Sequence, residues 1–288
     1  MRQPAIRTVQ CVSPAGLHRM AYKEWGDPDN ARVLICVHGL TRVSDDFDVL
    51  GNALADAYRV VCPDLPGRGR SDWLRDPRHY QVPQYLADVV TLIARLDVDG
   101  VDWLGTSLGG LVGMALAALP GTPVRRLVLN DIGPVLDPQA LERIAQYVGE
   151  PVSFATFDEA EQHVRQTSAS FGPHTDAQWR KLAADVLRQD AAGRWHYHYD
   201  AGLAIPFKAM DAEAARQAQD MLWSAYDAIA CPTLLVRGAQ SDMLSRETAL
   251  AMTQRGPHAA LVELPGIGHA PTLVTEEQIS LVRRFLLT

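Results

Sequence analysis

The sequence has few of the features that mark nucleic-acid-binding or membrane proteins. Its 288 residues carry 27 Lys and Arg against 34 Asp and Glu, which gives a formal net charge of −7. Such a chain has no basic field with which to attract nucleic acid or an anionic membrane surface. The longest largely apolar run, residues 108–119, is about half of the roughly 20 residues that a spanning helix needs. We therefore expect neither a nucleic-acid nor a membrane partner.

Cysteine is also scarce. Cys11, Cys36, Cys62 and Cys231 lie far apart and form neither a CxxC pair nor a regular framework, which argues against disulfides and a zinc site. The N-terminal residues contain no long apolar segment of the kind that a secretory signal has. We therefore expect reduced thiols and a cytoplasmic location. A hydrophobic share of 47% with 21% charged residues excludes a mostly disordered chain.

What is present is an alternation of short apolar runs with helical patterns. Residues 31–37 (ARVLICV) form a nearly continuous β-branched run, which is typical of a strand buried on both faces of a parallel sheet. Apolar residues in 82–96 recur every three or four positions and predict a covering helix. This alternation predicts an α/β fold with an open, mostly parallel sheet. Further predicted strands are 58–62, 101–104, 126–130, 233–236 and 260–264, with an antiparallel edge hairpin of 6–11 and 17–25.

The alternation stops at residues 134–228, which show helical patterns and no clear buried strand. This segment holds 11 of the 20 aromatic residues, and its 14 acidic and 8 basic residues give it a net charge of −6. The aromatic content predicts a small core of its own and a pocket wall. The acidic charge indicates either a solvated helical surface or a rim that disfavours strongly anionic substrates.

A candidate nucleophile lies in the sequence Gly105-Thr106-Ser107-Leu108-Gly109, between a predicted strand and a predicted helix. This is a G-x-S-x-G pattern in the strand-turn-helix context that it requires. Flanking glycines make room for the strained turn that raises the serine above the sheet, and the start of the helix directs free N–H groups toward a developing oxyanion. The alternative is a plain turn serine.

A serine hydroxyl needs a histidine base that is held by a carboxylate. His269 lies in a glycine-rich loop after the last predicted strand, and that loop leaves the same sheet edge as Ser107, so we predict that His269 is the base. His38 follows another strand and is expected to shape its turn. His196 and His198 alternate along one segment, but no third metal ligand is evident near them.

Two carboxylates compete for the third position. Asp242 follows the predicted strand 233–236 and preserves the chain order Ser, Asp, His. Asp131 directly follows the preceding strand, whose end faces the same site. We predict Asp242 as the acid and keep Asp131 as the alternative, with a helix-capping role if it is not the acid.

With these motifs in place, nearly the whole chain resembles the α/β-hydrolase fold superfamily, in particular its capped serine esterase-like branch. The resemblance rests on His38-Gly39-Leu40, the loop 64–71, the turn at Ser107, residues 238–242 and Gly268-His269. It implies a core of residues 1–133 and 229–288, with a helical cap, residues 134–228, inserted after the sixth strand. It further implies an oxyanion hole made by the backbone N–H groups of Leu40 and Leu108, and no cofactor or metal.

Departures from neighbouring families narrow the expected reaction. Haloalkane dehalogenases and epoxide hydrolases carry an aspartate where this chain has Ser107, and carbon-carbon hydrolases of ring degradation typically have a tryptophan where it has Ala270. We therefore predict a carboxylic-ester hydrolase that forms an acyl-enzyme on a small or medium-sized substrate, such as a short hydroxyacid-oligomer ester. Carbon-carbon cleavage, thioester cleavage and a non-catalytic binding role remain as alternatives, and nothing in the sequence indicates an oligomeric state.

Overall fold

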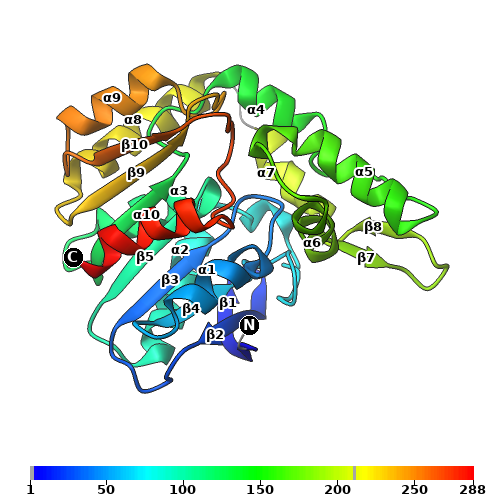
Figure 1. Cartoon of the computed structure of the whole chain (residues 1–288), viewed down its shortest axis with the longest axis horizontal. Coiled ribbons are helices and arrows are strands. Elements are labelled where there is room, and N and C mark those ends of the chain that lie inside the picture. Colours follow the sequence, from blue (N-terminus) through cyan, green and yellow to red (C-terminus); the bar gives the residue numbers. More distant parts are fainter. Residues whose placement is uncertain (1–2, 210–211) are drawn as a thin grey trace.

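A computed structural model describes residues 3–209 and 212–288 of the chain. Eight strands of this described part form one sheet in the order β1-β2-β4-β3-β5-β6-β9-β10 (Figure 1). Neighbouring strands from β4 to β10 run parallel, whereas β1 and β2 are antiparallel at one edge. The strands are β1 (Ala5–Ser13), β2 (Gly16–Trp25), β3 (Val33–Val37), β4 (Arg59–Pro63), β5 (Val101–Thr106), β6 (Val124–Asn130), β9 (Thr233–Gly238) and β10 (Ala260–Leu264).

The apolar runs of the sequence become the central strands because both faces of the sheet are covered. All five residues of β3 are buried. In β1, by contrast, the first four residues are exposed and residues 9–13 alternate between buried and exposed side chains. This is the difference expected between a central parallel strand and an antiparallel edge strand. The predicted fold class is therefore confirmed, including the edge hairpin.

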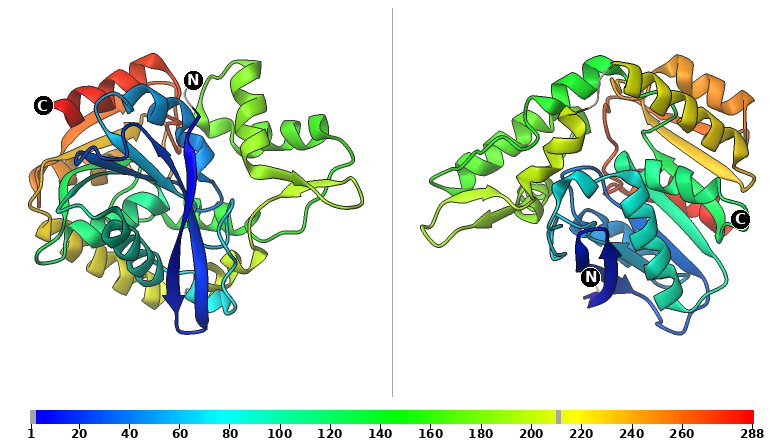
Figure 2. Two further views of the ribbon diagram at one scale, coloured as in Figure 1. Left: turned by 90° about the horizontal axis from the view of Figure 1, so that it is seen from below. Right: turned by 180° about the vertical axis from the view of Figure 1, so that it is seen from behind.

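Helices cover the two faces of the sheet, as the two views of Figure 2 show. On one face, the larger of the two apolar clusters lies between the sheet and four helices: α2 (Val82–Leu96), α3 (Leu108–Ala117), α8 (Ala212–Ala228) and α9 (Arg246–Gln254). The other face is covered by α1 (Asp48–Leu54) and α10 (Glu276–Leu287), which contribute Leu50, Leu54 and Val282 to a second cluster. Short 3-10 turns η1 (Ser44–Phe47) and η2 (Pro77–His79) complete this part of the chain.

Residues 134–208 project from the sheet after β6 and are here called the lobe (Figure 1). Its elements are α4 (Pro138–Ala145), α5 (Phe157–Thr167), η3 (Ala169–Phe171), α6 (Asp176–Val186), β7 (Leu187–Gln189), β8 (Trp195–Tyr197), η4 (Ala201–Leu203) and α7 (Ala204–Lys208). Ala140 and Ile144 of α4 join the larger apolar cluster of the sheet. The outer lobe, residues 154–198, instead has a separate apolar cluster.

In two details, the structure of residues 134–228 differs from the sequence prediction. The hairpin β7-β8 is a short antiparallel sheet within a segment predicted to be helical. Helix α8, which the prediction assigns to the insertion, packs against α3 and buries Tyr226 in the core beside the sheet. A long helix with one apolar face looks the same in sequence whether it covers a cap or a sheet, so the periodicity could not place α8.

The cysteines and the helices bear on two further sequence expectations. Cys11, Cys36, Cys62 and Cys231 are free thiols, and the first three are buried. In the described part of the chain, no helix combines the length and the apolar character needed to span a bilayer.

Candidate active site

Ser107 occupies a strained turn between β5 and α3. Its backbone lies at φ 52° and ψ −117°, and its N–H donates to the Asn130 carbonyl at 3.1 Å. Positive φ is rare for a residue with a side chain and persists where the surroundings impose it. A Cβ added to Gly105 would lie 2.2 Å from the Gly109 carbonyl oxygen, so the turn closes only with glycine at that position. The G-x-S-x-G pattern therefore forms the tight turn that the sequence predicted.

His269 lies on the loop between β10 and α10, within hydrogen-bond distance of Ser107. Its Nε2 is 2.9 Å from Ser107 Oγ, and its Nδ1 is 2.8 Å from Asp131 Oδ2. A carboxylate only accepts hydrogen bonds, so Nδ1 carries the proton and Nε2 is left to accept the serine hydroxyl proton. The imidazole side chain is 12% exposed. This arrangement can deprotonate Ser107.

The carboxylate that meets His269 is Asp131, the sequence alternative, and not Asp242. Asp131 is fully buried, and its oxygens also accept from the Gly238 N–H at 2.8 Å and from Ser241 Oγ at 2.6 Å. Asp242 is 47% exposed at its side chain and pairs with Arg143 of the lobe. The predicted contact between Asp242 and His269 is therefore wrong.

The strand order explains this correction. Asp131 directly follows the last residue of β6, and β6 lies between β5, which carries Ser107, and β9. Asp242 is displaced several residues beyond the end of β9, where the loop has already turned outward. That loop contributes the Ser241 hydroxyl to Asp131 instead of a carboxylate to His269. Both carboxylates fit the chain order Ser, Asp, His, so chain order alone could not separate them.

The turn after β3 passes close to the nucleophile. A Cβ added to Gly39 would be 3.7 Å from Ser107 Cβ, and Arg68 Nε donates to the Leu40 carbonyl at 2.8 Å. The Leu108 N–H belongs to the first turn of α3, where N–H groups have no partner within the helix. Both predicted oxyanion-hole residues, Leu40 and Leu108, thus lie on segments beside Ser107.

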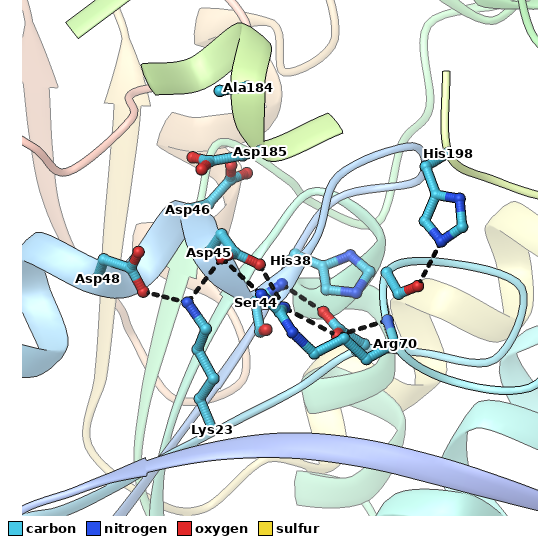
Figure 3. A network of polar contacts seen from close by, with 12 residues as sticks. Lys23, His38, Ser44, Asp45, Asp46, Asp48, Arg70, Ala184, Asp185 and His198 are labelled. Carbon is cyan, nitrogen blue, oxygen red and sulfur yellow. Dashed lines mark hydrogen bonds and ion pairs between the residues drawn. The ribbon is translucent and has the colours of Figure 1, made fainter. Parts of the chain in front are cut away.

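The other candidate histidines hold backbone in place. His38 is buried, with Nε2 accepting the Leu65 N–H at 3.0 Å and Nδ1 2.7 Å from the Gly39 carbonyl. Burial lowers the pKa of His38 to about 4, so it is neutral. His198 lies 2.8 Å from the Gly69 carbonyl (Figure 3), and His196 lies 3.1 Å from the Tyr197 carbonyl.

The lobe closes one side of a pocket that opens onto Ser107 and His269. Its contribution includes Arg143, Tyr147, Tyr197 and Tyr199. Ser170 of the lobe also contacts the loop that carries His269, because its Oγ donates to the His269 carbonyl at 2.6 Å and its carbonyl accepts from the Gly268 N–H at 2.6 Å. The lobe is therefore both a pocket wall and a support for the histidine loop.

Sequence reasoning did not single out Ser241, Ser170 or Arg143. Serine and arginine are common on surfaces and in loops, so each becomes informative only through its partner: Asp131 for Ser241, the His269 carbonyl for Ser170, and Asp242 for Arg143. The one available sequence signal was the polar pair Asn130-Asp131 directly at the end of an apolar run. A buried polar pair at a strand end points to the site more strongly than an aspartate in a longer loop.

Comparisons with known proteins agree with this geometry. The sequence profile of the alpha/beta hydrolase fold matches residues 32–274. The chain belongs to the α/β hydrolase family. A 3-hydroxybutyrate-oligomer hydrolase of Cupriavidus necator is 56% identical over 285 residues, which cover 98% of this chain and 97% of that protein. An esterase of Mycobacterium tuberculosis is 28% identical over 88% of this chain and 79% of its own length.

A solved structure of another α/β hydrolase, from Novosphingobium aromaticivorans, superposes with a TM-score of 0.87. It is 37% identical and covers 100% of this chain and 99% of its own. The sequence prediction of an enzyme of this family is thus confirmed: this chain is a hydrolytic enzyme with the α/β hydrolase fold.

Proposed function

We propose that this α/β hydrolase is a serine carboxylesterase with Ser107, His269 and Asp131 as its catalytic triad. The observation that carries the proposal is the continuous series of contacts from Ser107 Oγ to His269 Nε2 at 2.9 Å and from His269 Nδ1 to Asp131 Oδ2 at 2.8 Å. This is the geometry of a nucleophile, its base and the group that orients the base.

In the first half of the reaction, His269 Nε2 takes the hydroxyl proton while Ser107 Oγ attacks the ester carbonyl. The bond from the carbonyl carbon to the leaving alcohol then breaks, and the alcohol takes the proton from His269. Asp131 stabilises the imidazolium formed between these steps. In the second half, water activated by His269 hydrolyses the acyl-enzyme. This chemistry requires no cofactor.

Backbone N–H groups of Leu40 and Leu108 would stabilise the negative oxygen of the tetrahedral intermediates. Such a donor contributes about 3 kcal/mol where one has been removed in another serine hydrolase. The first turn of α3 adds the positive end of its helix dipole at the same place. The turn that carries the Leu40 N–H is held in position by the hydrogen bond from Arg68 Nε to the Leu40 carbonyl.

For the substrate, we propose short esters of a 3-hydroxy acid. The Cupriavidus necator relative is named for hydrolysis of 3-hydroxybutyrate oligomers, and its 56% identity extends over nearly all of both chains. The pocket also suits a short, moderately polar chain, because hydroxyl groups of Ser168, Thr167, Tyr197 and Thr272 line it beside apolar Ile144. The lobe acts as the cap that encloses the substrate.

Replacement of the nucleophile tests the reaction. Ser107→Ala should lower kcat for p-nitrophenyl butyrate and for a 3-hydroxybutyrate dimer by at least about 10³-fold, and should abolish labelling by a fluorophosphonate. Ser153→Ala is the matched control, because Ser153 Oγ accepts from Arg194 Nε at 2.9 Å at an exposed position. Turnover by Ser107→Ala equal to that of the control would refute the assignment of the nucleophile.

A further inference from the structure

The charged side chains that line the pocket are unevenly balanced. Arg42, Asp46 and Arg143 are the charged residues, His269 apart, among the described residues of its wall. Arg42 forms a two-bonded pair with Asp46, at 2.9 and 2.5 Å, and also donates to the Leu182 carbonyl at 3.3 Å. The charge of Arg42 is therefore balanced by Asp46, and its donors are used within the pocket wall.

Arg143 differs because its partner lies outside the pocket. Asp242 is not part of the lining, and its Oδ2 lies 2.8 Å from Arg143 Nε and 2.7 Å from Nη2. Within the described residues, Nη1 of Arg143 donates to no protein acceptor. The Arg143 side chain is 40% exposed, so the guanidinium group is still accessible to a ligand while it pairs with Asp242. The pocket wall therefore presents one positive group with unused donors.

We propose that Arg143 binds the free carboxylate end of the substrate, which makes the enzyme selective for hydroxyacid esters that end in a carboxylate. This inference rests on the proposed function. Every linear hydroxyacid oligomer has one such end, and a guanidinium pairs with a carboxylate through charge-assisted hydrogen bonds. Arg143 has five N–H donors, so it can bind a second carboxylate through Nη1 while its Nε still donates to Asp242.

The direction of the ester bond fixes which part of the substrate leaves first. In a 3-hydroxybutyrate dimer with its carboxylate on Arg143, the unit that bears the carboxylate is the alcohol side of the ester bond. Ser107 Oγ forms the new bond to the ester carbonyl, and the free 3-hydroxy acid departs with the proton from His269. The acyl-enzyme retains the hydroxyl end of the dimer, and water then releases it as the second monomer.

The competing explanation is that Arg143 and Asp242 only attach the lobe to the sheet. The two explanations differ for a matched pair of substrates: the 3-hydroxybutyrate dimer as free acid, and the same dimer as its methyl ester. Cleavage of the internal ester bond is followed for both by chromatography, and the measured quantity is the ratio of kcat/KM for the acid to that for the methyl ester. A structural attachment affects both substrates, whereas a carboxylate site affects their ratio.

We expect Arg143→Gln to lower this ratio about tenfold to a hundredfold, mainly through a higher KM for the acid. Arg143→Lys keeps the charge and should restore part of the ratio. Asp242→Asn should raise the ratio severalfold, because it removes the negative charge that neutralises Arg143 and repels the substrate carboxylate. Lys208→Gln is the control: it removes one positive charge from a lobe ion pair with Glu150, at 2.9 Å, that does not line the pocket, and it should leave the ratio as in the wild type.

Equal losses on both substrates in Arg143→Gln, or no preference for the acid in the wild type, would overturn the carboxylate site. Thermal melting of each variant identifies loss of folding, and if Arg143→Gln does not fold, the sign of the Asp242→Asn effect decides. Hydrolysis of p-nitrophenyl butyrate is measured in parallel. If that activity depends on Ser107 while the ratio does not depend on Arg143, the esterase proposal holds and only the carboxylate site fails.

Discussion

The sheet core and the outer lobe are built by different physical means. In the core, Ser107 and Asp131 of the proposed triad follow the central strands β5 and β6, and His269 follows the edge strand β10. Asp131 is fully buried, with three hydrogen-bond donors on its two oxygens. The outer lobe contacts the core mainly through polar groups, with Val43 as the core residue in its apolar cluster. The polar contacts include those of Lys181 with Asp48, Arg42 with the Leu182 carbonyl, Ser170 with the His269 carbonyl, His174 with Thr272 and His198 with the Gly69 carbonyl.

This difference separates the two tasks of the enzyme. Close packing around a buried hydrogen-bonded carboxylate resists displacement, which suits residues that must stay in catalytic geometry. Polar contacts near water exchange partners at low cost, which suits the proposed role of the lobe in selecting and admitting substrates. We therefore expect substitutions in the core to change kcat strongly, and substitutions at the lobe boundary to change selectivity and stability more modestly.

The largest predicted effect compares the two aspartates at the site. Asp131→Asn should lower kcat for p-nitrophenyl butyrate by about 10³- to 10⁴-fold, because an amide in this position no longer holds the His269 proton on Nδ1. Asp242→Asn should show a loss at least tenfold smaller, since its carboxylate pairs with Arg143 and not with His269. Equal losses, or a larger loss in Asp242→Asn, would contradict the assignment from the structure.

The same two aspartates show how far sequence could predict the site. The buried apolar runs predicted the strands, and the G-x-S-x-G turn and the late glycine-rich loop predicted that Ser107 and His269 meet, because strand ends of a parallel sheet share one edge. Which aspartate meets His269 depends on where the chain turns in the few residues after β6 and after β9. Periodicity carries no information on that turn, so the sequence order admitted both aspartates.

The lobe was less predictable for a related reason. Its helices were indicated by periodicity, but the hairpin β7-β8 has only three residues in each strand, too few to show an alternating pattern. Side chains such as Ser170 act through a contact 99 residues away along the chain. Contacts of this kind follow from the packing of the lobe onto the sheet, and no local pattern encodes them.

A second prediction concerns stability at the boundary between lobe and core. Asp185 on α6 faces Asp46 of the core (Figure 3), with Lys181 on its own helix at 2.8 Å and Arg42 also nearby. Burial, together with the Asp46 charge, raises the pKa of Asp185 to about 6, despite the opposing effect of Lys181 and Arg42. The folded state therefore keeps this proton to a higher pH than the unfolded state does.

The sign of the pH effect follows from this proton. Stability from protonated Asp185 is fully present below about pH 4 and is lost as the pH rises through about 6. Asp185→Asn cannot ionise, so its free energy of unfolding relative to the wild type should increase by about 2 kcal/mol between pH 4.5 and 7.5. Thermal melting at several pH values measures this. Asp176→Asn, with a side chain 93% exposed, is the control, and a parallel response of the two variants would contradict the prediction.

The smallest predicted effect tests whether the outer lobe supports the chemistry at all. Ser170→Ala removes the hydroxyl that donates to the His269 carbonyl at 2.6 Å but keeps the backbone bond from Gly268. One lost hydrogen bond at a partly buried site corresponds to about 1 kcal/mol, or about fivefold in rate. We expect this loss in kcat for p-nitrophenyl butyrate, with KM changed less than about twofold, because the carbonyl positions the imidazole and does not bind the substrate.

Two further variants separate this positioning role from a general weakening of the lobe. Ser170→Thr retains a hydroxyl and should recover most of kcat, whereas Ser153→Ala removes a hydrogen bond elsewhere in the lobe, to Arg194, and should leave kcat unchanged. A change confined to KM in Ser170→Ala, or the same fall in kcat in Ser153→Ala, would show that the lobe only encloses the pocket. The expected pattern would instead show that one polar contact from the outer lobe holds His269 in position against Asp131. The lobe would then both line the substrate pocket and position the proposed catalytic base.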